Sequence, residues 1–471
     1  MARKPVNKIL YNFSVINWFF FVVHQEVRYR RLNLKDDFLS LFSFLLIRIL
    51  KSLKSKNKKE YALECCEKMN PCLEENVSRL VKRIRKHFFW GCRVDFRFLL
   101  ALELLNTLRL LGGTEKNEQD ALSIITEFLE LPDTPFLNWT NDGVQNCIKD
   151  LKTRQSLDAF IDYCFKEESH NKLPVKNIAV CATMSAGKST FVNALLGRDV
   201  LPAKNEATTA KITSVYDKDG SDTMVGFIEK DGTVIDRLEN VDCLKLNQWN
   251  DLTTADRIFL QGDLDNIGNR GFVAAVHDTP GTNNSGDKSH LEITMHFLEK
   301  ADLDAVIYVA NAEHLCTTDE KSLLTHICDE IVKLREIPIL FILNKADNID
   351  REKEKLEDIV ESYRLFLKGI GFENETVMPV SSKGARLLKM ALNGRSEKFT
   401  EAEMDLFPSV LKKFVKRLNF SQSRAISDRE YENDTVLIDG VNYDCNQLKT
   451  ALSHTGIERI EKTIEKLFNK V

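Results

Sequence analysis

Apolar residues recur at helical spacing between about residues 61 and 165. Intervals of three and four residues place such positions on one face of an α-helix, where they can be buried together. Turn-forming segments, among them Gly112-Gly113 and the stretch 132–143, interrupt the pattern. We therefore predict an all-helical bundle domain over residues 61–165. One of its apolar stripes consists of Leu73, Val77, Leu80, Ile84 and Phe88.

The pattern changes after a polar segment, residues 166–176, which we interpret as a linker. Beyond it, short β-branched runs alternate with amphipathic helical segments, which is typical of a mainly parallel sheet flanked by helices. We predict an α/β domain over 177–471, with an insertion near 394–450 and a last helix that opens at Thr455. The predicted strands are 177–181, 211–216, 223–228, 272–276, 305–309, 337–343 and 376–380.

The segment 182–190, Ala-Thr-Met-Ser-Ala-Gly-Lys-Ser-Thr, lies between a predicted strand and a predicted helix. A phosphate-binding loop occupies this position and has the pattern GxxxxGK[ST]. Its backbone N–H groups surround the phosphates, its lysine reaches the β and γ oxygens, and its hydroxyl binds magnesium. Lys188 and Ser189 fit the last two roles, although Ala182 replaces the first glycine. The residues expected to contact the phosphates are Ser185, Ala186, Gly187, Lys188, Ser189 and Thr190.

A second candidate element, His277-Asp-Thr-Pro-Gly281, directly follows the apolar run 272–276. Asp278 is therefore expected at the C-terminal end of a strand, where ligands bind in open α/β sheets. An aspartate there can hold magnesium, and the N–H of Gly281 can meet a γ-phosphate. Taken alone, Asp-Thr-Pro-Gly is an ordinary turn sequence, and its functional interpretation depends on Lys188 upstream.

The third element, residues 344–347, ends another apolar strand and indicates which base is bound. Guanine offers two adjacent donors, N1–H and the exocyclic amine, and a carboxylate accepts both, whereas adenine has no such pair. We assign that acceptor role to Asp347. Asn344 and Lys345 are expected to brace the loop and to cover the base.

The fourth element consists of Ser381, Ser382 and Lys383, after the predicted strand 376–380. A backbone N–H at this place can face the guanine carbonyl, although Ser-Ser-Lys on its own is common in solvated turns. The four elements occur in this order, each at the end of a predicted strand. Together they predict a P-loop GTPase G domain that binds GTP and GDP.

The stretch 185–197, with Val200-Leu-Pro202 and Ala207-Thr-Thr-Ala210, resembles the GTPase domain of dynamin-like proteins, bacterial ones in particular. The resemblance covers about residues 172–471. It implies that Thr209 is the switch I threonine, which binds magnesium and helps place the attacking water. It also implies that Ser185 helps to hold a monovalent cation, K⁺ or Na⁺. The implied catalytic residues are Lys188, Thr209, Ser185 and Gly281, and the implied magnesium ligands are Ser189, Thr209 and Asp278.

The sequence departs from this family in two respects. Met184 stands where many dynamins have a glutamine that supports the catalytic water, and Ala182 replaces a glycine, so we expect slow turnover. Dynamin-like proteins also continue past the G domain into a helical stalk, whereas this sequence stops at Val471, after the helix expected to close the domain. We expect residues 1–170, or a second protein, to supply the stalk function.

The first 60 residues form a basic, aromatic-rich segment that we predict to be helical. They contain thirteen Lys or Arg and four Asp or Glu, and since the net charge of the chain is −4, the remainder carries −13. The longest apolar run, residues 15–23, is interrupted by Asn17 and is shorter than the roughly 20 residues that cross a bilayer. Three interpretations stay open: a helical bundle with a solvated basic face, peripheral attachment to an anionic membrane surface, and nucleic-acid binding. A nucleic-acid partner is the least expected of them.

The composition fits a globular intracellular protein. Of the 471 residues, 43% are hydrophobic and 29% charged, and the eleven cysteines lack the paired spacing of zinc sites. We predict a cytoplasmic dynamin-like GTPase that hydrolyses GTP to GDP and phosphate with Mg²⁺ and self-associates through its G domains. Peripheral attachment of this protein at the inner face of a membrane is compatible with the prediction and stays open. The alternative is a GTP-binding switch or scaffold with negligible hydrolysis that acts through a protein partner.

Overall fold

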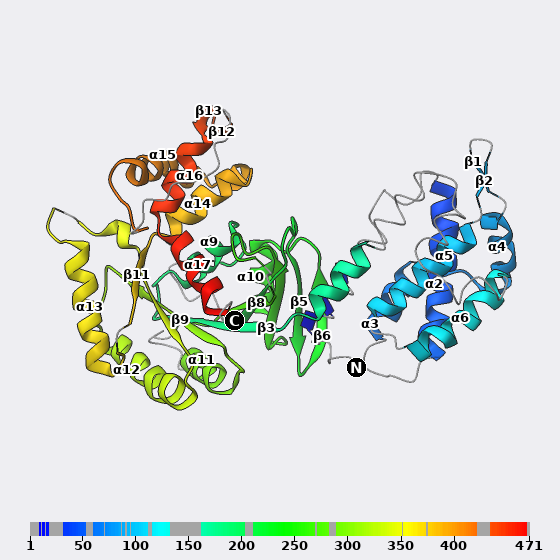
Figure 1. Cartoon of the computed structure of the whole chain (residues 1–471), viewed down its shortest axis with the longest axis horizontal. Helices are drawn as coiled ribbons and strands as arrows, with labels where there is room; N and C mark the ends of the chain where they lie inside the picture. The colour runs from blue at the N-terminus through cyan, green and yellow to red at the C-terminus, as the bar shows by residue number, and fades with distance from the viewer. Residues whose placement is uncertain are drawn as a thin grey trace. The chain divides into compact units, whose positions relative to one another are not determined.

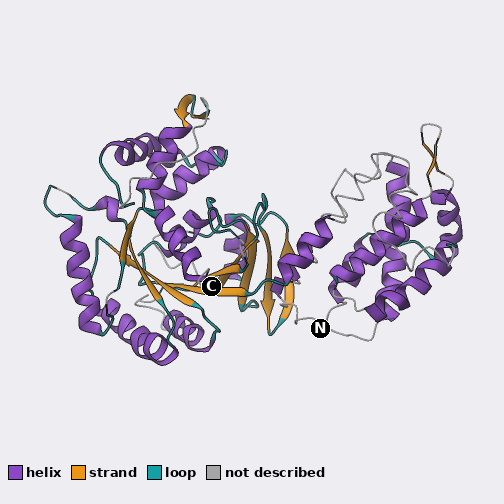
Figure 2. Ribbon diagram, viewed as in Figure 1, coloured by secondary structure: helices purple, strands orange, loops and turns teal. Residues whose placement is uncertain are grey.

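Figures 1 and 2 show a computed structural model of the chain, which divides into two compact units, Met1–Leu173 and Pro174–Val471. Each unit has its own hydrophobic core. The structure describes residues 9–10, 12–14, 16–17, 32–52, 60–69, 71–85, 87–89, 92–94, 96–111, 115–131, 162–202, 211–268, 271–281, 289–350, 352–373, 375–421 and 434–468.

The first unit is mainly helical, as the apolar spacing predicted. Its long helix α2 packs against α3, α4, α5 and α6, and apolar side chains of all five helices share one core. One short hairpin was not predicted, and it places Phe88 on a strand instead of a helical stripe. The elements are α2 (Leu32–Ser52), α3 (Glu60–Lys68), η1 (Glu74–Asn76), α4 (Val77–Arg85), β1 (His87–Phe89), β2 (Cys92–Val94), α5 (Phe96–Leu110) and α6 (Glu115–Leu129).

Helix α2 belongs to the basic N-terminal segment and yet lies in the core of the bundle. Phe38, Phe42, Leu45 and Ile49, spaced by three or four residues, are fully buried. The apolar face of α2 therefore packs inside the unit and is not presented to a membrane. Two further clusters of the basic segment, the aromatic residues 18–21 and the arginine-containing residues 28–31, lie outside the described part of the chain.

The segment predicted as a linker, 166–176, contains regular structure. Residues 162–171 are helical, and strand β3 begins at Val175. Ser14 Oγ donates to Glu167 Oε2 at 2.8 Å, which joins this helix to the N-terminal residues of the same unit. The segment was predicted to be a linker because it is rich in charged and amide side chains, but hydrogen bonds of these side chains connect it to other residues of the unit.

Nine strands of the described chain form one sheet, in the order β11-β10-β9-β3-β8-β4-β7-β5-β6. The strands from β11 to β8 are mutually parallel, β4 runs antiparallel to β8, and β5 and β6 complete an antiparallel edge. The bounds are β3 (Val175–Cys181), β4 (Ile212–Asp217), β5 (Val225–Lys230), β6 (Thr233–Leu238), β7 (Arg257–Gly262), β8 (Val273–Asp278), β9 (Ala305–Asn311), β10 (Ile339–Asn344) and β11 (Val377–Val380).

Helices cover both faces of this sheet. In Figure 1, α11 and α12 lie on one side, and α9, α14 and α17 lie on the other. The α/β prediction is confirmed, with β6 and β7 as additional strands. The remaining elements are α9 (Lys188–Leu196), α10 (Cys243–Asp251), α11 (Ser289–Lys300), α12 (Thr318–His326), η3 (Ile327–Lys333), η4 (Ala346–Asn348), α13 (Leu356–Ile370), α14 (Ser382–Leu392), η5 (Ser396–Lys398), α15 (Glu401–Lys416), β12 (Thr435–Ile438), β13 (Val441–Asp444), α16 (Cys445–His454) and α17 (Ile457–Phe468).

The segment predicted as an insertion near 394–450 contributes α15, the β12–β13 hairpin and most of α16, and both helices pack against α14. The last helix opens at Ile457 and not at Thr455, because Thr455 ends α16. Gly456 makes the break: its φ is +88°, and a Cβ there would lie 2.4 Å from the carbonyl oxygen of Pro379.

A buried ion pair fastens α17 to the rest of the unit. Lys389 Nζ on α14 lies 2.5 Å from Glu461 Oε1 on α17, and both side chains are almost fully buried. The same ammonium donates to the main-chain oxygens of Leu195 and Asp265. The ion pair thus links the C-terminal helix to the end of α9.

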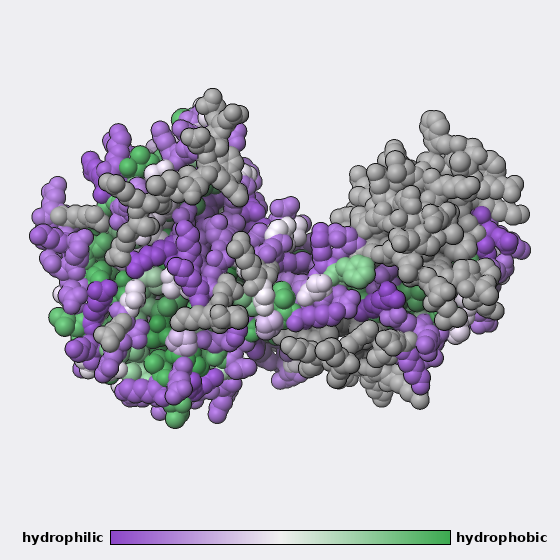
Figure 3. Space-filling model, in the orientation of Figure 1, coloured by the Kyte–Doolittle hydropathy of each residue, from purple (hydrophilic) through white to green (hydrophobic). Residues whose placement is uncertain are grey.

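On the face shown in Figure 3, the described surface is mostly polar, with apolar side chains scattered over it. In the part of the chain that the structure describes, no helix combines the length and the apolar character needed to span a bilayer.

Candidate active site

The loop between β3 and α9 lies at the C-terminal end of a central strand. Ser185 and Gly187 both adopt left-handed backbone conformations, with φ of +58° and +85°. Their turns carry the chain from the strand into α9, whose first residue is Lys188. A helix N-terminus reached in this way presents unpaired backbone N–H groups, which favour an anion such as phosphate.

Lys188, Ser189 and Asp278 come together beside this loop. Ser189 Oγ donates to Asp278 Oδ2 at 2.8 Å, and Lys188 Nζ lies 3.8 Å from Asp278 Oδ1. All three side chains are buried, and burial raises the pKa of the Asp278 carboxyl even though Lys188 and the Ser189 hydroxyl oppose the shift. Asp278 Oδ1 has no hydrogen-bond partner among the described residues.

This pair of oxygens suits a magnesium ion. Mg²⁺ is a hard cation that takes oxygen ligands, usually one or two from the protein with the rest from water and phosphate. The Ser189 hydroxyl and the partnerless Asp278 oxygen are ligands of that kind, and Lys188 beside them supplies a positive charge for phosphate oxygens.

The segment that follows β8 crosses the phosphate loop. The backbone N–H and the hydroxyl of Thr279 both donate to the carbonyl oxygen of Val180, at 3.3 and 2.9 Å. A Cβ added to Gly281 would lie 3.5 Å from the Cα of Met184 and 3.9 Å from Lys188 Nζ. Gly281 therefore lies within reach of the same space as Lys188, where a terminal phosphate would be expected.

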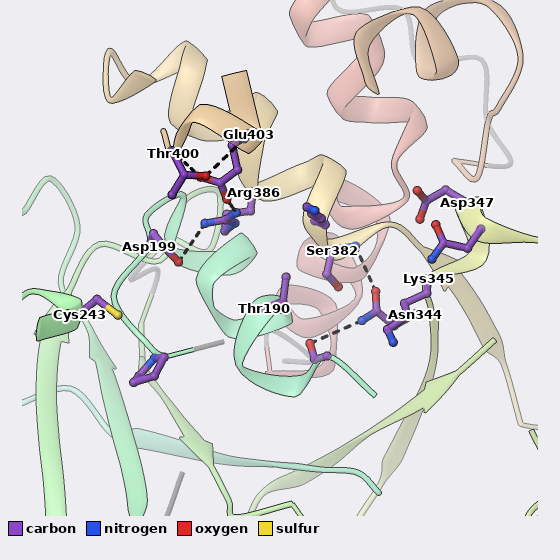
Figure 4. Close-up of a pocket in the computed structure, with 14 residues that line it drawn as sticks. Thr190, Asp199, Cys243, Asn344, Lys345, Asp347, Ser382, Arg386, Thr400 and Glu403 are labelled. Carbon is purple, nitrogen blue, oxygen red and sulfur yellow. Dashed lines mark hydrogen bonds and ion pairs between the residues drawn. The ribbon is translucent and has the colours of Figure 1, made fainter. Parts of the chain in front are cut away.

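One carboxamide joins the phosphate loop to the two loops of the base side. Asn344 Nδ2 donates to the carbonyl oxygen of Ala186 at 2.8 Å, and Asn344 Oδ1 accepts from the N–H of Ser382 at 3.1 Å. A Cβ on Gly187 would lie 2.4 Å from Asn344 Nδ2, so no larger residue fits there without movement. Figure 4 shows Asn344 beside Ser382, with a dashed line for the hydrogen bond between them.

Asp347 lies on the short helix η4 and is paired with a lysine from α15. Lys413 Nζ lies 3.2 Å from Asp347 Oδ2 and also donates to the main-chain oxygen of Asp347. Beside it, Lys345 has φ of +59°, and its ammonium lies 3.3 Å from Glu313 Oε2. No local pattern pointed to Lys413, because it lies 66 residues away in the predicted insertion.

The loop before α14 contributes backbone donors, and two of them are already engaged. The N–H of Ser381 donates to Thr455 O, and that of Ser382 donates to Asn344 Oδ1. The Ser381 hydroxyl caps α14 by accepting from the N–H of Gly384. Of the predicted tripeptide, Lys383 is therefore the residue whose N–H is best placed for a ligand carbonyl.

A cavity of about 570 Å³ is lined by residues of the phosphate loop, of the segment 344–348 and of the start of α14 (Figure 4). Sequence reasoning missed Arg386, whose guanidinium pairs with Asp199 at 2.9 Å and with Glu403 on the cavity wall. Charged residues on separate helices give no spacing signal, so only the fold reveals such a cluster. The cavity is lined by Gly187, Thr190, Asp199, Pro202, Cys243, Asn344, Lys345, Asp347, Asn348, Ser382, Lys383, Arg386, Thr400 and Glu403.

The structure thus brings the predicted residues of all four elements to one edge of the sheet, apart from Thr209. Thr209 lies outside the described residues, as do the two residues after Gly281. Ala182 is fully buried at the end of β3, and the side chains of Met184 and Ser185 are exposed.

Comparison with known proteins finds similarity over the part of the chain that carries this site. Residues 178–346 match the sequence model of the dynamin family. An uncharacterized protein from a xynA 3′ region of Caldicellulosiruptor sp. (strain Rt8B.4) is 28% identical over 244 residues. These residues are 51% of this chain and 56% of that relative, so the chain spans little more than half of the relative's length.

Solved structures give weaker similarities. A bacterial dynamin, from an oligomerised pair described as sensing and tethering membranes at long range, is 18% identical, with a TM-score of 0.37. That match covers 85% of this chain and 61% of the other. Era of Aquifex aeolicus bound to GDP and AlF₄⁻ is 20% identical over 45% of this chain and 52% of its own, with a TM-score of 0.27. These scores add nothing to the fold described above, and the similarity that the comparisons establish is the match of residues 178–346 to the sequence model of the dynamin family.

Proposed function

We propose that the protein binds GTP and hydrolyses it to GDP and phosphate. The observation that carries the proposal is the arrangement of Lys188, Ser189 and Asp278 at the N-terminus of α9, with a buried Asp278 oxygen that lacks a hydrogen-bond partner among the described residues. This site offers a positive charge and oxygen ligands at the start of a helix. Phosphoryl transfer requires little more from a protein than positioning and charge stabilisation.

The phosphate side of the site would act through this chain's own groups. Lys188 and the N–H groups of the loop from Ser185 to Thr190 bind the phosphate oxygens. The N–H of Gly281 meets the terminal phosphate, and Thr209, by its resemblance to the switch I threonine, positions the attacking water. Ser189 and Asp278 hold Mg²⁺, which when bound neutralises the charge on the β- and γ-phosphate oxygens.

The base side would select guanine. The Asp347 carboxylate accepts from the two adjacent donors of the base, and the N–H of Lys383 faces the guanine carbonyl. Asn344 braces the loops, and Lys345 covers the base. By the family resemblance, Ser185, whose side chain is exposed, would help to hold K⁺ or Na⁺.

The direct test is phosphate release from GTP by the purified full chain and by its Lys188→Ala variant. The variant should lose GTP binding and turnover, whereas Lys353→Ala, which removes a lysine with 81% of its side chain exposed, should behave as the parent. Asp347→Asn should shift preference from GTP towards xanthosine triphosphate. Normal turnover by the Lys188 variant would refute the assignment of the site.

A second function, a GTP-dependent switch with negligible hydrolysis, is favoured by the exposed Met184, which has no group able to orient water. A single-turnover assay at high protein concentration separates the two functions. Measurable phosphate release supports the enzyme, and intact GTP binding without release supports a switch that acts through a protein partner.

We further propose that the GTP cycle is coupled to self-association through the G domains, as the family resemblance implies, and to peripheral contact with an anionic membrane. A specific hydrolysis rate that rises with protein concentration supports self-association. Sedimentation with anionic liposomes tests the membrane contact, which should weaken when Arg28, Arg30 and Arg31 are neutralised. Because the apolar face of α2 is core, the contact would depend mainly on charge.

A further inference from the structure

Three aspartates gather at the edge of the sheet opposite the nucleotide site. Asp217 ends β4, Asp219 lies in the following loop, and Asp263 directly follows β7. One carboxylate oxygen from each lies within 4.8 Å of the others. Because β4 is antiparallel to β8 and Thr213 pairs with Asp278, Asp217 lies four residues further along β4, about 13 Å from the level of Asp278.

The Asp217 side chain is fully buried and is not satisfied by the protein. Its Oδ1 accepts from the N–H of Leu264 at 2.9 Å, but its Oδ2 has no hydrogen-bond partner within the described chain. A buried carboxylate oxygen without a partner is costly, and such groups are rare in native proteins. Burial, with the charges of Asp219 and Asp263 added, raises the pKa of Asp217 to about 9.

One cation near the cluster, Arg198, has its hydrogen bonds elsewhere. Its guanidinium donates to the main-chain oxygens of Ser221 and Asp222, at 2.5 and 2.8 Å. Burial raises the pKa of Asp263, the negative charge of Asp265 adds to this shift, and the charge of Arg198 opposes it. The cluster therefore combines an excess of negative charge with oxygen atoms that converge on one another.

We propose that Asp217, Asp219 and Asp263 form a binding site for a hard divalent cation, with Ca²⁺ favoured over Mg²⁺. Three carboxylates are ligands for a hard cation and not for a soft one. Mg²⁺ usually keeps several waters and takes one or two carboxylates, whereas Ca²⁺ accepts more oxygen ligands from the protein. Three converging carboxylates therefore favour Ca²⁺.

The bound cation would join the ends of two neighbouring strands. Asp217 and the residue before Asp263, Gly262, are the last pair in the register of β4 and β7. Binding there stabilises the folded chain by mass action, because the unfolded chain lacks the site. The site is independent of GTP binding and persists if the proposed function fails.

The test is calorimetric titration of the full, nucleotide-free chain with CaCl₂ after removal of metals with EDTA, together with thermal unfolding in the presence and absence of Ca²⁺. The parent should bind Ca²⁺ and unfold at a higher temperature when it is present. Asp217→Asn and Asp263→Asn keep the side-chain shapes and remove a charge, so each should weaken binding at least tenfold and abolish the thermal shift.

Two control variants locate the effect. Asp231→Asn, at an exposed turn with φ of +47° that asparagine tolerates, should bind Ca²⁺ as the parent does. Ser189→Ala alters the predicted Mg²⁺ site and should also leave the Ca²⁺ titration unchanged. The proposal is overturned if the parent shows neither heat nor thermal shift at millimolar Ca²⁺, or if both cluster variants bind as the parent does. Equal affinity for Mg²⁺ would overturn the preference for Ca²⁺.

Discussion

At the scale of single residues, Gly187 and Asn344 set the geometry of the phosphate loop. The carboxamide of Asn344 occupies the space that a Cβ at Gly187 would need, and it holds the loop through the carbonyl oxygen of Ala186. A glycine at this position therefore serves both the left-handed backbone and the close approach of the side chain.

Gly187→Ala should weaken GTP binding by more than tenfold, because the added methyl displaces Asn344 from the loop. Isothermal titration with a non-hydrolysable GTP analogue measures the effect. Gly394→Ala is the matched control: its φ of +66° imposes similar backbone strain, but no atom lies within 4 Å of the added Cβ. If both variants bind the analogue equally well, the contact with Asn344 does not control the loop.

His277 should make stability sensitive to acid. It is buried, contacts Ser214 Oγ at 2.8 Å and Asn177 Oδ1 at 3.1 Å, and burial lowers its pKa to about 3. Since the pKa in the unfolded chain is near 6.5, the unfolded state binds the proton first, and stability is lost as pH falls from 6.5 towards 3. Between pH 7 and 5 the loss from this group is about 2 kcal/mol.

Urea unfolding at pH 7 and pH 5 measures this loss. His277→Asn removes the titrating ring and should reduce the difference between the two pH values by about that amount. A pH dependence identical in the parent and the variant would contradict the assignment. Carboxylates elsewhere contribute equally to both proteins, so they cancel in the comparison.

At the scale of elements, α15 extends the base site. It comes from the segment predicted as an insertion, and its Lys413 contacts both the carboxylate and the main-chain oxygen of Asp347. This double contact fixes the short helix η4 on which Asp347 lies. Helix α15 thereby becomes part of the proposed base recognition, although its first residue, Glu401, follows Asp347 by 54 residues in the sequence.

Lys413→Met should weaken GTP affinity by about fivefold, roughly 1 kcal/mol, because Asp347 loses the contact that orients it. Binding of a fluorescent GTP analogue measures this change. Lys412→Met, at the exposed neighbouring position of the same helix, should have no effect. Tighter GTP binding by the Lys413 variant would show instead that this lysine competes with guanine for the carboxylate.

The elements also show what the sequence could and could not predict. Strands with continuous apolar runs, such as β9 and β10, were predicted within two residues of their bounds. Strand β6 was missed because it lies at the edge of the sheet, where its residues are exposed or only partly buried and its apolar residues neither alternate with polar ones nor form a long run. The break at Gly456 was missed because it depends on Pro379, a contact that only the folded chain creates.

In the candidate site too, local sequence patterns were predictable and tertiary contacts were not. Lys188, Asp278 and Asp347 could be named from the sequence because each belongs to a motif with fixed local spacing. Arg386 and Lys413 could not, because their partners lie on other elements. Local motifs predict the groups that contact a ligand, and tertiary contacts decide which further groups hold them in place.

At the scale of the whole second unit, stability depends on the buried pair of Lys389 and Glu461. Burial raises the pKa of Glu461 to about 7 even beside Lys389, so the loss of hydration of the two charges offsets part of their attraction. Lys389→Met leaves an unpaired buried carboxyl and should destabilise the unit by about 3–5 kcal/mol. Chemical denaturation of the full chain measures the loss.

The double variant Lys389→Met with Glu461→Leu is the control, because it removes the charge that the single variant leaves unpaired. It should recover most of the lost stability. A double variant as unstable as the single one would mean that Lys389 acts through its bonds to the carbonyl oxygens of Leu195 and Asp265 instead.

Helix α9 is fixed at both ends, and this has a mechanical consequence. Ser189 ties its first turn to Asp278, while Lys389 and Arg395 bind the carbonyl oxygens of Leu195 and Gly197 at its far end. Nine helical residues make a rod about 13 Å long that does not compress. If the arrival or loss of a phosphate tilts the first turn of α9, the far end of the helix would move with it. That movement would displace Lys389, and its ion pair with Glu461 would pass the displacement to α17.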